Sequence, residues 1–127
     1  MSINWVQSRS ECCTAKIFSD LSFAVKTDVD ARKNLGYEGA SFDADTSDSR
    51  IMVTRTIRSS SVQTVEFTRG FNEITVKSTN LRNGPIDFSA KFRLNSEGRC
   101  VFVVESRELE SWQLRQEALE ELFFGPF

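Results

Sequence analysis

Residues 86–104 read IDFSAKFRLNSEGRCVFVV, and this stretch decides the fold class. Apolar and polar side chains alternate from Ile86 to Leu94, which is the period of a strand with one face in a core. The sequence NSEG at 95–98 is typical of a hairpin loop, because glycine accepts the positive φ that such loops often need. Residues 100–104 are apolar on both faces and predict a covered central strand. The stretch therefore predicts an antiparallel β-hairpin.

Segments upstream extend this hairpin into a meander, because they are β-branched or alternate in polarity and are separated by turn residues. The predicted strands lie near 50–58, 62–68, 71–79, 86–94 and 99–105. We expect them to pair in sequential antiparallel order, and the alternation predicts that Phe88, Phe92, Phe102 and Val104 are buried. Residues 37–49 are rich in Gly, Asp and Ser and predict a surface loop, with a short edge strand around 40–42 as an option.

Two helices are predicted outside the meander. From Ser106 the apolar period changes to that of a helix, which Gly125-Pro126 ends. We expect this helix to begin within two residues of Arg107 and to bury Trp112 and Leu119.

Residues 12–35 fit either a helix or a strand. A strand would need about 17 extended residues, which is long, so the helix is favoured and the strand is kept as the alternative. The helical stripe consists of Cys13, Ile17, Leu21, Ala24, Ala31 and Leu35.

These elements predict one α+β domain over residues 1–127. A polar arm at 1–10 precedes an N-terminal helix, a meander of about five antiparallel strands, and a C-terminal helix packed on one face. Thr and charged residues on the other face of the sheet are typical of a solvated surface, and a partner-binding sheet is the alternative.

Composition argues against several classes of function. The net charge of −2 gives no overall attraction to nucleic acid or anionic membranes, so neither is an expected partner. The chain contains no histidine and no glycine-rich phosphate-binding motif, so we expect neither an enzyme nor a cofactor. Histidine and C-x-x-C pairs are both lacking, which argues against a zinc site.

The cysteines and the start of the chain predict a cytoplasmic protein. Cys12, Cys13 and Cys100 are odd in number and follow no framework spacing, so we expect three reduced thiols. The first residues show no signal-peptide pattern of a basic region followed by an apolar run. The sequence also has no stretch of about 20 apolar residues, the length needed to cross a bilayer. Asp43, Asp45 and Asp48 lack the glycine and closing glutamate of a calcium loop, and they are interpreted as solvated loop charge.

Two charged residues interrupt apolar faces and are candidate site residues. Arg55 shares a strand face with Ile51, Val53 and Ile57, and Asp28 lies on the helical stripe. In the simpler interpretation, Arg55 lies near the sheet edge and its guanidinium reaches water. In the alternative, Arg55 and Asp28 mark a ligand or anion pocket between helix and sheet.

The C-terminal helix carries more aromatic residues than one buried stripe needs. They are Trp112, Phe123, Phe124 and Phe127. They either close the core or form an interface with a second copy or a partner protein. The preferred function is therefore a small cytoplasmic protein-interaction module or adaptor, with a homodimer as one form. The alternative is a small-ligand carrier with its pocket between the concave sheet face and the helices.

Overall fold

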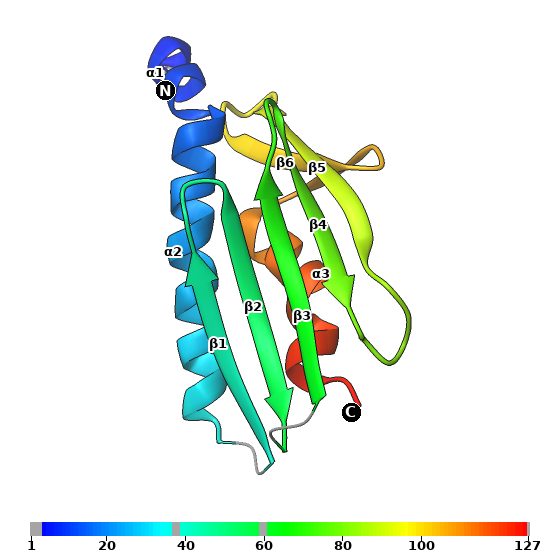
Figure 1. Ribbon diagram of the computed structural model, residues 1–127. Helices are drawn as coiled ribbons and strands as arrows, with labels where there is room; N and C mark the ends of the chain where they lie inside the picture. The colour runs from blue at the N-terminus through cyan, green and yellow to red at the C-terminus, as the bar shows by residue number, and fades with distance from the viewer. Residues whose placement is uncertain (1–3, 37–38, 59–60, 127) are drawn as a thin grey trace.

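The computed structural model describes residues 4–36, 39–58 and 61–126. It has two N-terminal helices, an antiparallel sheet and a C-terminal helix (Figure 1), so the α+β class is confirmed. In chain order the elements are α1 (Trp5–Glu11), α2 (Thr14–Asn34), β1 (Ala40–Thr46), β2 (Arg50–Ile57), β3 (Ser61–Arg69), β4 (Glu73–Thr79), β5 (Asp87–Leu94), β6 (Cys100–Val104), β7 (Arg107–Leu109) and α3 (Ser111–Phe124).

The sheet is a sequential meander in the order β1-β2-β3-β4-β5-β6-β7. Every pair of neighbouring strands is antiparallel, as the sequence predicted. The expected number of about five strands was wrong, because the described residues form seven. Strand β1 extends through a segment that was expected to be mostly loop. The strand was hard to predict because two of its inward residues are small alanines on either side of Phe42. Strand β7 has three residues, too few for a period to be recognised.

The hairpin of β5 and β6 forms as predicted. The Asn95 amide donates to the Arg99 carbonyl at 2.8 Å, and Gly98 has a φ of 79°. The Asn95 side-chain oxygen also accepts from the Glu97 and Arg99 amides. Phe102 and Val104 are buried, whereas Phe88 and Phe92 are only half-buried, which corrects the expectation of a fully enclosed β5 face.

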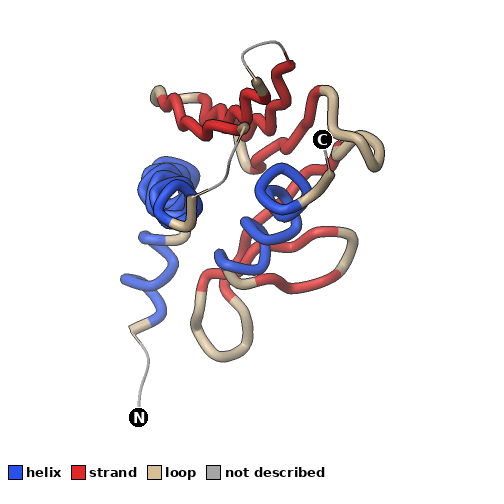
Figure 2. The backbone as a smooth tube through the Cα atoms, turned by 90° about the horizontal axis from the view of Figure 1, so that it is seen from below, coloured by secondary structure: helices blue, strands red, loops and turns tan. Residues whose placement is uncertain are grey.

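Helix α2 confirms the helical interpretation of residues 12–35. It ends at Asn34, and Gly36 follows with a φ of 72°, a value that favours glycine. Figure 2 shows α2 and α3 on the same side of the sheet. The buried residues of α2 are Ile17, Phe18, Leu21, Val25, Val29 and Arg32. The predicted stripe is therefore rotated from the true core face, and only part of it is buried.

Helix α3 begins later than expected, at Ser111. Residues 107–109 first pair with β6 as strand β7, and Glu105 and Ser106 adopt positive φ in the tight turn between these strands. Glu110 then caps the helix through a capping box with Gln113. Leu119 is buried as expected, but Trp112, seven residues earlier on the same face, is 54% exposed, which corrects the expectation that the helix buries it.

The N-terminal region is fixed by a disulfide. Cys12 and Cys100 are bonded with their Cα atoms 5.5 Å apart, which corrects the expectation of three reduced thiols. Residues of the expected polar arm form the short helix α1, which has no buried residue. Cys13 is the free cysteine of the described chain. The bond attaches the α1–α2 junction to β6.

One hydrophobic core lies between the helices and the sheet. Its fully enclosed strand residues include Ile51, Val53, Val65, Phe67, Ile74 and Val76, which face α2 and α3. Within the described residues, no helix is long and apolar enough to cross a membrane.

Candidate functional site: the groove between α2 and α3

A groove of about 340 Å3 is lined by residues of α2 and α3. The two helices are visible in Figure 2 as separate coils. The groove is lined by Asp28, Ala31, Arg32, Leu35, Trp112, Arg115, Gln116, Leu119, Phe123 and Phe124. It therefore contains Asp28 and three of the aromatic residues that the sequence selected.

The α2 wall includes residues of the predicted stripe that the core does not use. Ala31 and Leu35 are exposed and line the groove, as does the half-buried Asp28 between them and the core. In a helix, positions three, four and seven residues apart share a face, so these three form one continuous wall. The helix is thus apolar over a wider arc than packing on the sheet requires.

The α3 wall carries two exposed aromatic rings. Trp112 is 54% exposed and Phe124 is 66% exposed, and both line the groove. Leu35, the C-cap residue of α2, lines the same groove and is 69% exposed. Phe123 is buried instead, with its ring centroid 5.7 Å from that of Phe42 in an edge-on contact. Phe127 lies outside the described residues.

An ion pair crosses the groove and fixes the distance between the helices. Arg115 Nε donates to Asp28 Oδ2 at 2.6 Å, and Arg115 Nη1 donates to Ser111 Oγ at 2.6 Å. Both side chains are mostly shielded from water, which strengthens their attraction but also costs desolvation. We therefore assign the pair a geometric role. It joins α2 to α3 through two residues that are 87 positions apart in the sequence.

Arg32 of α2 links this helix to the C-terminal end of α3. Its Nε donates to the Phe123 carbonyl at 2.8 Å, and its guanidinium lies 4.7 Å from the Phe42 ring centroid. It also lies 5.1 Å from the Phe124 ring centroid, a cation–π contact. This role of Arg32 was not predicted from the sequence. The available signal was spacing, since Arg32 follows Val25 by seven residues and Val29 by three on the buried face.

Arg55 belongs to a different contact. It is 1% exposed, so the expectation that its guanidinium reaches water at an edge is wrong. Its Nε donates to Gln63 Oε1 at 2.6 Å, and its two terminal nitrogens donate to the carbonyls of Gly125 and Pro126 at 3.0 Å each. Arg55 therefore holds the C-terminal end of α3 against the sheet. The structure does not place it beside Asp28.

Known proteins give no guide to this groove. Comparison with protein-family models, curated proteins and solved structures finds no match to the chain. Among the described residues, no group of three or more Cys, Asp or Glu side chains is placed to hold a metal ion. What the groove offers chemically is apolar surface around one internal ion pair.

Proposed function

We propose that this chain is a protein-interaction module that docks through the α2–α3 groove and self-associates there. One observation carries the proposal: Leu35, Trp112 and Phe124 are large, apolar and exposed, and they line the same groove. Fully burying one such side chain contributes about 1.5–3 kcal/mol. A cluster of exposed apolar side chains is typical of an interaction surface, whereas scattered ones need no explanation.

A two-fold arrangement would let α3 serve both copies. If the exposed faces of two α3 helices pack antiparallel about an axis at the level of residue 118, Trp112 of one protomer lies near Phe124 of the other, because both are six residues from that level. The same arrangement places Gln116 opposite Glu120, so no like charges meet at that position. Such an arrangement would bring two exposed rings together and place an amide, and not a second carboxylate, opposite Glu120.

The carrier alternative has less support. The space between the sheet and the helices, where the ligand was expected, is filled by fully buried side chains such as Val53, Phe67 and Val76. A cytoplasmic location stays a prediction, and the Cys12–Cys100 disulfide favours an oxidising compartment instead.

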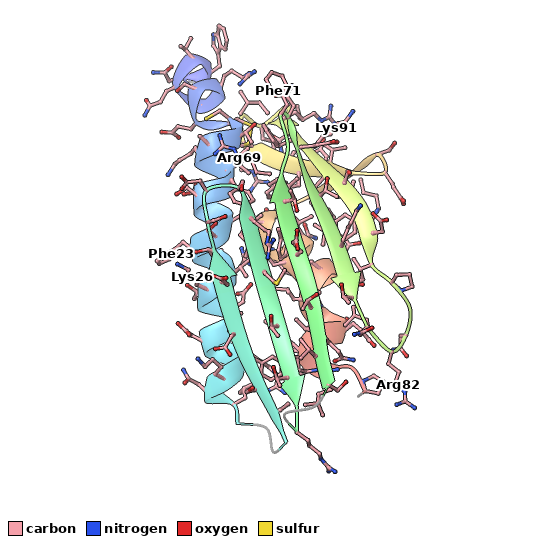
Figure 3. The ribbon with its side chains drawn as sticks, in the orientation of Figure 1. Phe23, Lys26, Arg69, Phe71, Arg82 and Lys91 are labelled. Atoms are coloured by element: carbon pink, nitrogen blue, oxygen red, sulfur yellow. A yellow bond between two sulfur atoms is a disulfide. The ribbon has the colours of Figure 1, made fainter. Side chains whose placement is uncertain are left out.

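Replacing both exposed rings with serine, as Trp112→Ser/Phe124→Ser, should lower the apparent mass in light scattering toward the 14.4 kDa monomer. The serines remove the apolar area that the dimer would bury, while α3 keeps its buried face. A matched control is Phe23→Ser/Phe71→Ser, because these rings are also exposed but lie away from the groove (Figure 3). Equal masses for wild type and the groove variant would reject self-association through this surface.

A further inference from the structure

The open edge of the sheet at β1 is a second surface that the groove does not involve. Strand β1 pairs with β2 alone and is the first strand of the sheet. Figure 1 shows it as the outermost strand, in front of α2. A strand at an edge presents unpaired amides and carbonyls, which can pair with an added strand.

The register identifies which backbone groups are open. Ser47 N donates to the Arg50 carbonyl at 2.8 Å, and Arg58 N donates to the Gly39 carbonyl at 2.9 Å. Hydrogen-bonded pairs recur at every second residue of an antiparallel ladder, so Ser41, Asp43 and Asp45 bond to β2. The amides and carbonyls of Ala40, Phe42, Ala44 and Thr46 therefore point toward the open edge.

Hollows flank both ends of this edge. One, of about 270 Å3, separates residues 40–43 from Arg32 and Lys33 of α2. Another, of about 300 Å3, lies between Thr46–Asp48 and the N-terminal half of α2, beside Ser19 and Ser22. Helix α2 thus packs under β1 without closing the space along its edge at either end.

The charges on β1 define the chemistry of the strand that fits. Asp43 and Asp45 are exposed on the outer face, and no described residue forms an ion pair with either. They are two residues apart, so they are separated by about 7 Å along the strand. An added strand with cations at alternate positions would match that spacing through cross-strand pairs.

A second copy of β1 is a poor occupant of the same edge. Its sequence ASFDADT contains no cation, so antiparallel self-pairing would place carboxylates opposite or diagonal to carboxylates. We infer that the β1 edge binds an extended basic segment of a partner protein by strand addition, with lysine or arginine at alternate positions facing Asp43 and Asp45.

The probe is a labelled, end-capped peptide of sequence TKTKTKT, matched in length to the seven residues of β1. Asp43→Asn/Asp45→Asn should weaken its binding, measured by fluorescence anisotropy, at least about tenfold. Asp30→Asn/Asp87→Asn is the control, because it changes the net charge equally at exposed carboxylates outside β1. A peptide in which glutamate replaces lysine should not bind.

Two versions of the peptide, N-methylated on alternate amides in the two patterns, separate strand addition from charge attraction. Only the pattern that blocks the amides facing β1 should abolish binding. Peptide binding should also slow hydrogen exchange of the Phe42 and Ala44 amides. The groove variant Trp112→Ser/Phe124→Ser should bind the peptide as wild type does. The inference is overturned if TKTKTKT does not bind, if both methylated peptides bind as the parent does, or if the control variant weakens binding equally. It also fails if the peptide displaces a second copy of the chain from this edge.

Discussion

Reducing the Cys12–Cys100 disulfide is expected to lower the free energy of unfolding by about 4–5 kcal/mol. The bond joins residues separated by 88 positions. Opening it gives the unfolded chain conformations that the closed loop excludes, and this entropy stabilises the unfolded state. Small domains have total stabilities of about 5–15 kcal/mol, so the loss would leave the reduced protein marginal or unfolded at room temperature.

Urea unfolding followed by far-UV circular dichroism, with and without reductant, measures this loss. Cys12→Ser/Cys100→Ser should reproduce the effect of the reductant. Cys13→Ser is the matched control, because Cys13 is the neighbouring residue and takes no part in the bond. If the oxidised and reduced proteins unfold at the same urea concentration, the disulfide does not stabilise the fold.

Phe67→Ala is expected to cost about 3–5 kcal/mol, because it removes a fully buried ring and leaves a cavity. Phe67 lies on β3 opposite Ile51 of β2 and Val76 of β4, both also fully buried. Neighbours held in two ladders cannot move far to fill the space. Phe92→Ala should cost less, since Phe92 is only half-buried.

Phe71→Ala provides the control for this prediction. Phe71 follows Phe67 by four residues, is 89% exposed, and lies at the turn between β3 and β4 (Figure 3). Its loss should change the free energy of unfolding by about 0.5 kcal/mol or less. Similar denaturation midpoints for Phe67→Ala and Phe71→Ala would show that the inner face of β3 is not the core.

The sequence predicted those elements in which the periodic alternation of apolar and polar residues continues over a long segment and the inward residues are large. The hairpin at 86–104 and helix α2 meet both conditions, and both are present. Strand β1 fails the second condition, because Ala40 and Ala44 are inward but small. Strand β7 fails the first, and its formation shifts the start of α3 to Ser111. A local sequence pattern cannot predict a strand that forms mainly because it pairs with a neighbouring strand.

The candidate site was predictable only as a set of residues, and their burial was not. The excess of aromatic residues on α3 left open whether the rings close the core or form an interface; Phe124 is exposed, and so is Trp112, which was expected to be buried. The contacts of the buried arginines were not predictable, because each joins elements distant in sequence. Arg55 bonds to Gly125, 70 residues away, and Arg32 to Phe123, 91 residues away. Only the folded chain brings these partners together.

Native mass spectrometry of the purified, oxidised protein tests the central proposal most directly, because it reports oligomeric state and retained ligand together. We predict a species of twice the 14.4 kDa chain mass, without added small-molecule mass, that Trp112→Ser/Phe124→Ser converts to monomer. A wild-type monomer at high concentration that carries a small molecule would contradict the interaction proposal and favour the carrier.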